Sequence, residues 1–184
     1  MGKDVFLDLK MHDIPNTVGE AVRMGVRHGA HMMTIHASGG PEMMAKAVDA
    51  ARTEAEKRGT SKPILLGVTI LTSLKSEDLG TIGMAADAAG QVKRLAGLAR
   101  KSGMDGIVCS AQEIEIVRAE VGPGMLIVTP GIRPAGADAQ DQKRVMTPAL
   151  AVAKGSDYLV IGRPITQAVS PAAAFDAIVA ELGD

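Results

Sequence analysis

The sequence of 184 residues contains no tryptophan, two phenylalanines, one tyrosine and one cysteine, and neither sign of charge is in marked excess. So few aromatic side chains provide no base-stacking surface of the kind that binds single-stranded nucleic acid. The 20 Lys and Arg residues against 21 Asp and Glu residues give a formal net charge of -1. This balance gives no electrostatic reason to expect nucleic-acid or membrane binding. No apolar run approaches the ~20 residues of a membrane-spanning helix.

The single cysteine also bears on the compartment and on the core. A lone Cys109 cannot form an internal disulfide, which is typical of proteins in the reducing cytoplasm, and we expect it to be a buried small apolar residue. The N-terminal residues lead straight into a strand-like run without a signal peptide, so we expect a cytoplasmic protein. Eleven methionines and many alanines predict a core of flexible and small side chains.

Short apolar runs alternate with longer segments of helical spacing. The runs are typical of parallel strands covered on both faces, and they lie at 5–10, 32–37, 63–71, 106–110, 125–130 and 158–163. The helical spacing predicts helices at 17–29, 41–59, 85–103, 111–122 and 171–183. Glycines stand where C-caps of four of these helices would fall, at Gly29, Gly59, Gly103 and Gly122, and Pro41 fits a first helical turn.

The alternation of strands and helices predicts an α/β fold with a parallel sheet, in one domain spanning 1–184. Six βα units of about 31 residues each are present, whereas eight such units would approach the ~250 residues typical of a (β/α)₈ TIM barrel. The chain is therefore either an open six-stranded sheet or an incomplete barrel of about six βα units. Periodicity alone leaves both possibilities open.

The strongest candidate for chemistry is the first strand and the turn after it. Asp8 and Lys10 are two residues apart on a predicted strand, so we expect their side chains to share one face. Opposite charges in an apolar run are costly to bury unless they pair or serve a function. Asp13 follows beyond the carboxyl end of the strand, where α/β active sites are built. The alternative is a buried Asp8–Lys10 ion pair that only fixes the strand.

Two later loops carry glycine and cationic or amide side chains at strand ends. The loop at 129–144 contains Arg133, Gln142, Lys143 and Arg144, and the loop at 160–167 contains Gly162 and Arg163. In a barrel these loops follow the last two strands, a common place for a phosphate. A single arginine after a strand is more often a surface charge, but two such loops in succession favour an anion site.

The remaining candidates are weaker. Thr72 or Ser73 could hydrogen-bond a polar ring edge or only cap a turn. The segment 36–41 is interpreted as a helix-entry loop, and the charge run 52–58 as a solvated helix face with opposite-charge pairs. The four histidines show no metal-like grouping, so no metal ligand is expected among them.

Together, these segments resemble the orotidine 5'-phosphate decarboxylase family. FLDLKMHDIPNT resembles the family's D-x-K-x-x-D signature followed by I-P-x-T, and LTS, TPGIRP with DQKR, and VIGRPIT resemble its other active-site loops in the same order. The resemblance extends over essentially all 184 residues. D-x-K-x-x-D alone is less specific, since sugar-phosphate decarboxylases and synthases of the same superfamily share it.

The resemblance implies decarboxylation of orotidine 5'-phosphate to UMP in pyrimidine biosynthesis by a homodimer, with no cofactor and no metal. It implies that Lys10 protonates C6 of the pyrimidine and that Asp8 lies beside the departing carboxylate. The other residues that match the family are Asp13, Ile14 and Thr17, which would reach the neighbouring subunit's site, Thr72, which would contact the pyrimidine, and a phosphate-binding set of Pro130, Arg133, Gln142, Gly162 and Arg163.

The resemblance also implies two βα units ahead of the D-x-K strand, carrying a ribose-contacting aspartate and a second lysine. Only MGKD precedes VFLDLK here, so we expect an N-terminally truncated form that is catalytically impaired and exposes apolar surface on strand 5–10 and its neighbour. Two alternatives stay open. One is a magnesium-dependent sugar-phosphate decarboxylase or synthase, and the other is a non-catalytic fragment that binds partner chains through its exposed edge.

Overall fold

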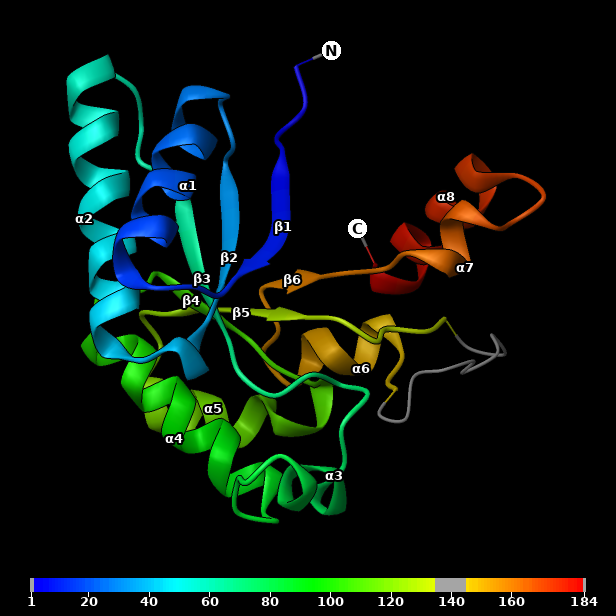
Figure 1. Ribbon diagram of the computed structural model, residues 1–184. Helices are drawn as coiled ribbons and strands as arrows, with labels where there is room; N and C mark the ends of the chain where they lie inside the picture. Colours follow the sequence, from blue (N-terminus) through cyan, green and yellow to red (C-terminus); the bar gives the residue numbers. More distant parts are fainter. Residues whose placement is uncertain (1, 135–144, 184) are drawn as a thin grey trace. The chain divides into compact units, whose positions relative to one another are not determined.

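Six strands alternate with helices in the computed structural model, which describes residues 2–134 and 145–183 (Figure 1). Their order in the sheet is the order of the chain, and their bounds are β1 Phe6–Met11, β2 Met32–His36, β3 Ile64–Val68, β4 Gly106–Val108, β5 Leu126–Thr129 and β6 Tyr158–Leu159. All six coincide with predicted runs, although the predicted strands 63–71 and 158–163 are shorter than expected. Gln142, Lys143 and Arg144 lie outside the described residues.

The helices follow the predicted pattern with three additions. The bounds are α1 Pro15–Arg27, α2 Pro41–Arg58, α3 Ser76–Thr81, α4 Ala88–Lys101, α5 Ile114–Val121, α6 Pro148–Ala153, α7 Arg163–Thr166 and α8 Pro171–Leu182, with short 3₁₀ turns η1 Ala37–Gly39 and η2 Ala111–Glu113. All five predicted helices are present. The sequence missed α3, α6 and α7, since four to six residues are too few to show a helical period.

By its contacts the chain divides into two compact units. One comprises Met1–Thr69 and Lys93–Ile107, and the other comprises Ile70–Val92 and Val108–Asp184. Each unit has its own helices and hydrogen-bonded strand pairs. The expected single domain over 1–184 stays a prediction.

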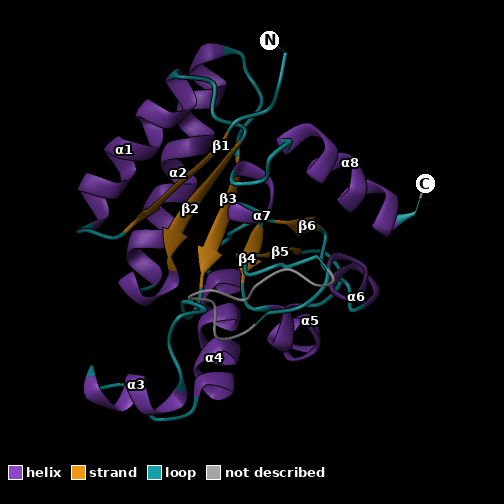
Figure 2. Cartoon of the chain, turned by 90° about the vertical axis from the view of Figure 1, so that its right-hand side faces the viewer, coloured by secondary structure: helices purple, strands orange, loops and turns teal. Residues whose placement is uncertain are grey.

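In the first unit, β1, β2 and β3 run parallel, and the arrowheads of β2 and β3 point the same way in Figure 2. Helices α1 and α2 lie side by side against these strands (Figures 1 and 2). Met33 on β2 and Met43 and Met44 on α2 are completely buried, as the abundance of methionine predicted. Gly25 lets α1 approach β2, because a Cβ there would collide with the sulfur of Met33.

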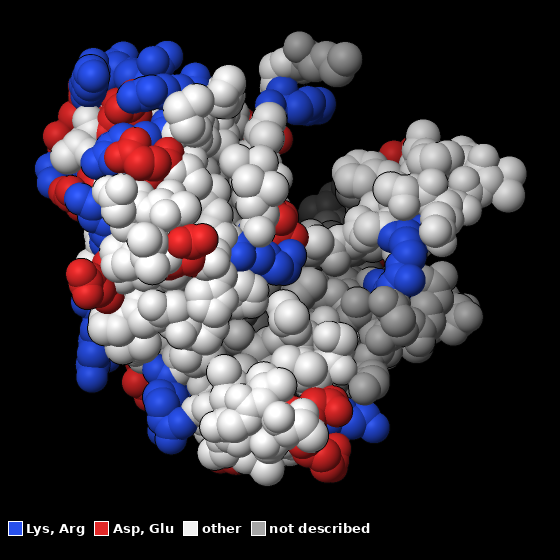
Figure 3. Space-filling view, in the orientation of Figure 1, with Lys and Arg blue, Asp and Glu red and all other residues white. Residues whose placement is uncertain are grey.

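Strand β1 is an edge strand with an exposed apolar surface. Val5, Phe6 and Leu9 are 50%, 36% and 63% exposed, and in Figure 3 the charged side chains gather over α1 and α2 while the surface over β1 is mostly uncharged. The expected exposure of strand 5–10 is confirmed. The same expectation for its neighbour is wrong, because β2 is hydrogen-bonded on both sides and buried up to its last residue. Likewise, burial on both faces holds for the inner strands but not for β1 or β6.

Three smaller predictions are decided here. Cys109 is 1% exposed, which confirms a buried small residue. Segment 36–41 forms η1 and the start of α2, which confirms a helix-entry loop. In the run 52–58, Arg52 pairs with Asp49 and Glu56 as expected. Glu54 contradicts the solvated-face interpretation, since it is buried and its carboxylate accepts a hydrogen bond of 2.7 Å from Arg27 of α1.

The Glu54–Arg27 pair predicts a pH-dependent contribution to stability. The hydrogen bond from Arg27 holds the pKa of Glu54 below its usual value, so the stabilisation is present above the ordinary carboxyl pKa and is lost as the pH falls through the lowered one. We expect Glu54→Gln to lower the free energy of unfolding at neutral pH, and the difference from the unmodified chain to vanish in acid. Urea denaturation across a pH series measures this.

Glu56→Gln is the matched control, because Glu56 is an exposed carboxylate on the same helix. It is expected to change the free energy of unfolding less than Glu54→Gln at neutral pH. Equal effects of the two substitutions, or a difference that persists in acid, would contradict a role for the Glu54 carboxylate.

The same kind of hydrogen-bonded contact lies at the start of one strand in each unit. The Asp105 carboxylate accepts the Leu65 N–H of β3 at 2.8 Å, and the Asp157 carboxylate accepts the Ile127 N–H of β5 at 2.7 Å. Each aspartate also donates its own N–H to the carbonyl of the same strand residue. His31 resembles them, since its Nδ1 accepts the Val5 N–H ahead of β1. Within the described residues, a Gly-x-Asp or Gly-x-His sequence contacts the start of the preceding strand in this way three times.

Candidate active site

The carboxyl-terminal half of β1 contains a bulge that presents Asp8 and Lys10. Phe6 and Leu7 pair regularly with β2, and pairing resumes at Met11 opposite Ile35, so three residues of β1 lie opposite Thr34 alone. Lys10 has a φ of 50°, in the left-handed region that side chains rarely adopt. The sequence predicted a shared face by regular alternation, and the structure instead brings these side chains together through a bulge, a feature common beside active sites.

Asp8 and Lys10 form an ion pair at the end of this bulge. The Lys10 ammonium donates to Asp8 Oδ2 at 2.6 Å, and the Thr34 hydroxyl donates to Asp8 Oδ1 at 2.8 Å. The Lys10 and Asp8 side chains are 38% and 39% exposed, so the alternative of a buried structural ion pair is wrong. An ammonium group that is partly exposed to solvent and lies next to a carboxylate can contact a ligand and donate a proton to it.

Asp13, Ile14 and Thr17 lie where the chain turns from β1 into α1. The Asp13 carboxylate accepts the Ile14 N–H at 2.6 Å, and Ile14 precedes the first residue of α1. The Ile14 side chain is 67% exposed, and Thr17 is also exposed. An exposed isoleucine beside charged side chains is available to another molecule, which is compatible with the role the family resemblance implies.

Two histidines lie beside this pair. The rings of His12 and His36 are 5.3 Å apart between centroids. Burial lowers the pKa of His36, and the nearby His12 and Lys10 lower it further, while Asp8 acts in the opposite direction. A neutral imidazole at the carboxyl end of β2 can donate or accept a hydrogen bond without adding charge.

The second unit holds the remaining described candidates, all on loops or at helix starts. Thr72 lies in the turn between β3 and α3, and Pro130 directly follows β5. Gly162 and Arg163 form the entry to α7. Gly162 has a φ of -100° and a ψ of -98°, and the space where a Cβ would stand is open.

Arg133 is the most unusual of these residues because its guanidinium is buried. The residue is 7% exposed, and Nη1 donates to the Ile132 carbonyl at 2.9 Å. Its Nε is buried and has no hydrogen-bond partner among the described residues. A buried guanidinium with an unused donor is costly unless an anion completes it.

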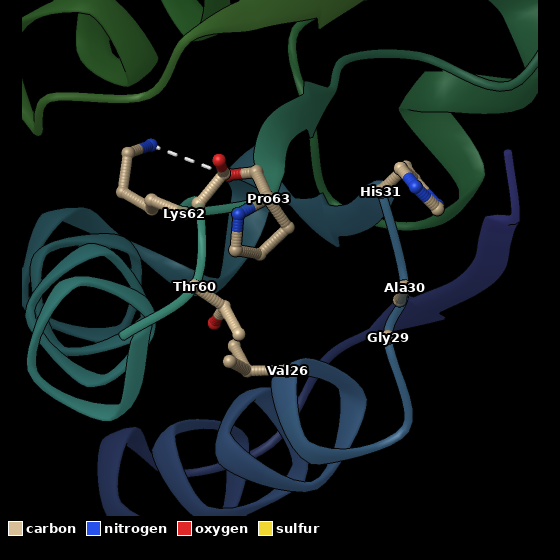
Figure 4. Close-up of a pocket in the computed structure, with 8 residues that line it drawn as sticks. Val26, Gly29, Ala30, His31, Thr60, Lys62 and Pro63 are labelled. Atoms are coloured by element: carbon tan, nitrogen blue, oxygen red, sulfur yellow. Dashed lines mark hydrogen bonds between the residues drawn. The ribbon is translucent and has the colours of Figure 1, made fainter. Parts of the chain in front are cut away.

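A cavity lies elsewhere in the first unit. It has a volume of about 380 Å³ and is lined by residues of the α1–β2 and α2–β3 connections, including His31 and Lys62 (Figure 4). These residues precede β2 and β3, whereas Asp8 and Lys10 lie toward the other ends of the strands. The Lys62 ammonium forms an ion pair with Asp105 Oδ2 at 2.5 Å and donates a hydrogen bond to the Pro63 carbonyl. This cavity is therefore separate from the candidate site.

The described residues contain neither a metal-ligating cluster nor a helix suited to span a membrane. Within 2–134 and 145–183, no group of three or more His, Cys, Asp or Glu side chains could hold a metal ion. Over the same residues, no helix has the length and apolar character needed to cross a membrane.

Sequence reasoning missed Thr34 and His36 as members of the site. Both belong to β2, and the three remaining residues of this strand are apolar. The available signal was a polar residue inside a buried strand next to the D-x-K strand. The lack of metal-ligand spacing around His36 carries no information about its position beside Lys10.

Comparison with known proteins identifies close relatives in sequence. The model of the orotidine 5'-phosphate decarboxylase / HUMPS family matches residues 1–178. A protein of Aliivibrio fischeri (strain MJ11) named orotidine 5'-phosphate decarboxylase is 55% identical over 170 residues, covering 92% of this chain and 71% of that protein. A protein of the same name from Pseudomonas aeruginosa (strain LESB58) is 54% identical over 182 residues, covering 99% of this chain and 76% of the relative.

Solved structures agree with the sequence matches. The crystal structure of orotidine 5'-phosphate decarboxylase from Lactobacillus acidophilus superposes with a TM-score of 0.86 at 41% identity, covering all of this chain and 77% of the other. An uncharacterized conserved protein from Geobacillus kaustophilus gives a TM-score of 0.83 at 36% identity. These matches confirm the α/β class of the (β/α)₈-barrel family with about six βα units, and the enzyme class, a carboxy-lyase. The chain belongs to the orotidine 5'-phosphate decarboxylase / HUMPS family.

Proposed function

We propose that this protein decarboxylates orotidine 5'-phosphate to UMP, a reaction of pyrimidine biosynthesis. The observation that carries the proposal is the Asp8–Lys10 pair, with 2.6 Å between carboxylate and ammonium at the carboxyl-terminal end of β1. Curated relatives more than half identical to the chain bear the name of this activity. A cytoplasmic location fits the lone cysteine.

Lys10 is the proposed proton donor. Loss of carbon dioxide leaves negative charge on C6 of the pyrimidine, and no adjacent carbonyl absorbs that charge directly. A cationic ammonium both stabilises the developing charge and supplies the proton that replaces the carboxyl group. Asp8, held beside Lys10, faces the departing carboxylate and disfavours the bound substrate relative to the transition state. The lysine accomplishes both tasks, so the proposed reaction uses no cofactor and no metal.

The family resemblance assigns further residues to the far parts of the substrate. Arg133 and Arg163 bind the 5'-phosphate together with Gln142, Gly162 and Pro130. Thr72 contacts the pyrimidine. Among the described residues the buried Nε of Arg133 has no hydrogen-bond partner, which supports an anion at this side chain. The phosphate is remote from the bond that breaks, so its binding energy serves to hold the reacting end in place.

A homodimer is part of the proposal. Asp13, Ile14 and Thr17 reach the active site of the partner subunit, as the family resemblance implies. The high exposure of Ile14 supports this, because an isoleucine two-thirds exposed gains from burial against another chain. Sedimentation velocity on the unmodified chain and on Ile14→Asp tests the interface, and an unmodified chain that sediments as a monomer at assay concentrations contradicts it.

A polypeptide of these 184 residues, assayed by itself, is expected to convert orotidine 5'-phosphate more slowly than its longer relatives. The ribose-contacting aspartate and second lysine that the family resemblance implies have no counterpart among these 184 residues. Each missing charge-assisted contact costs on the order of 10–100-fold in rate or affinity. Release of carbon dioxide from carboxyl-labelled substrate measures the rate, with the Pseudomonas aeruginosa relative as reference.

The same assay is repeated with a peptide that covers the two βα units placed ahead of the D-x-K strand. Restored conversion supports the proposed function. No conversion with or without the peptide, together with no UMP binding, overturns it. Conversion that a metal chelator abolishes would instead indicate the magnesium-dependent enzymes of the superfamily.

A further inference from the structure

Thr34 occupies the position opposite the bulge of β1. Its neighbours Met33 and Ile35 keep regular pairing with Leu7 and Met11, so Thr34 alone lies opposite Asp8, Leu9 and Lys10. On its other side, Thr34 pairs with Leu66 of β3, and it is completely buried. A bulge leaves ladder groups without strand partners, and Thr34 is the residue of β2 placed to satisfy them.

One hydroxyl group connects both functional residues. Thr34 Oγ1 accepts the Lys10 N–H at 2.9 Å and donates to Asp8 Oδ1 at 2.8 Å. The direction of both bonds is fixed, because the amide can only donate and an ionised carboxylate can only accept. The hydroxyl thereby holds the Lys10 backbone in its left-handed conformation and fixes the carboxylate that pairs with the Lys10 ammonium.

We propose that Thr34 is a positioning residue, which holds Lys10 and Asp8 in their catalytic arrangement through its hydroxyl group. A left-handed non-glycine residue is strained and persists only when its surroundings hold it. Valine at position 34 would fill the same volume but leave the Lys10 N–H and Asp8 Oδ1 without this partner. The inference rests on the proposed function for its catalytic meaning, whereas the coupling itself concerns only the arrangement of Lys10.

The test compares Thr34→Val, which removes the hydroxyl, with Thr34→Ser, which keeps it. The first readout is the rate at which an amine-reactive acylating reagent modifies Lys10 relative to Lys57 in the same molecule, measured by peptide mass spectrometry. Lys57 is an exposed lysine on α2. Loss of one hydrogen bond in the network is expected to raise the relative rate by about two- to tenfold in Thr34→Val, and Thr34→Ser is expected to match the unmodified chain.

The second readout is turnover, with kcat and KM determined separately at equal concentrations of folded protein. Misplacement of the reacting group is expected to lower kcat by about 10–100-fold in Thr34→Val, with little change in KM because the phosphate contacts remain. Thr53→Val is the control, since it removes a hydroxyl that only bonds to the backbone of α2. It is expected to leave both readouts unchanged.

The two readouts distinguish a failure of the proposed function from a failure of the positioning role. If no variant converts orotidine 5'-phosphate but the Lys10 modification rate still responds to the hydroxyl, the proposed function fails and the coupling stands. If Thr34→Val and Thr34→Ser behave alike in both readouts, the positioning role is overturned. Should Thr34→Val not fold, Thr34→Cys takes its place, because a thiol is only a weak hydrogen-bond donor and acceptor.

Discussion

Lys10→Met is expected to lower the rate of orotidine 5'-phosphate decarboxylation by about 10²–10⁴-fold, because it removes the proposed proton donor. Methionine keeps most of the length of the side chain. Neither residue is glycine, so the left-handed backbone at position 10 is equally unfavourable in both. Release of labelled carbon dioxide measures the rate, in the presence of the two-unit peptide so that the unmodified chain gives a measurable baseline.

Lys57→Met is the matched control for this substitution. Lys57 lies near the end of α2 and is exposed, so its loss is expected to leave the rate unchanged. Circular dichroism establishes that both variants are folded. A Lys10→Met variant that is folded and retains the rate of the unmodified chain would show that another group delivers the proton.

Arg163→Ala is expected to weaken UMP binding by about 10–100-fold, the effect of losing a charge-assisted hydrogen bond to phosphate. Uridine, which has the same base and ribose without the phosphate, is expected to bind the variant and the unmodified chain equally well. Isothermal titration calorimetry with UMP, and competition experiments with uridine, measure the two affinities. The difference between the ligands isolates the phosphate contact from any general damage to the protein.

Lys154→Ala provides the control in the same unit, since this cation lies on the surface and pairs with Glu115 at 2.9 Å. It is expected to alter neither affinity. If Arg163→Ala weakens UMP and uridine to the same extent, Arg163 supports the fold or the base contact rather than the phosphate, and the proposed role is wrong.

Much of the fold could be predicted because its signals are local. The apolar run at 32–37 and the helical spacing at 41–59 appear in the structure as β2 and α2, almost residue for residue. Gly59 ends α2 in the left-handed conformation, with a φ of 64°, as its position in the sequence predicted. These features depend on neighbouring residues along the chain, so periodicity and capping rules apply to them directly.

Glu54 shows where local signals fail. In the sequence it belongs to a charged run that reads as a solvated helix face, and its neighbours Arg52 and Glu56 do form surface pairs. Its burial depends on α1, because its carboxylate accepts a hydrogen bond from Arg27, which lies 27 residues earlier in the chain. A partner at that separation leaves no periodic trace, so only the packing of the two helices shows that this carboxylate is buried.

The sequence by itself determined the alternation of strands and helices, the family, and the residues of the D-x-K-x-x-D signature, because each is carried by residue identity and short spacings. The tertiary structure decided how those residues are presented. The bulge of β1, the left-handed Lys10 and the bonds from Thr34 exist only when β1 and β2 pair. Asp8 and Lys10 are close in the chain, but the hydroxyl that orients them comes from 24–26 residues away, and a contact of that range arises from folding rather than from local pattern.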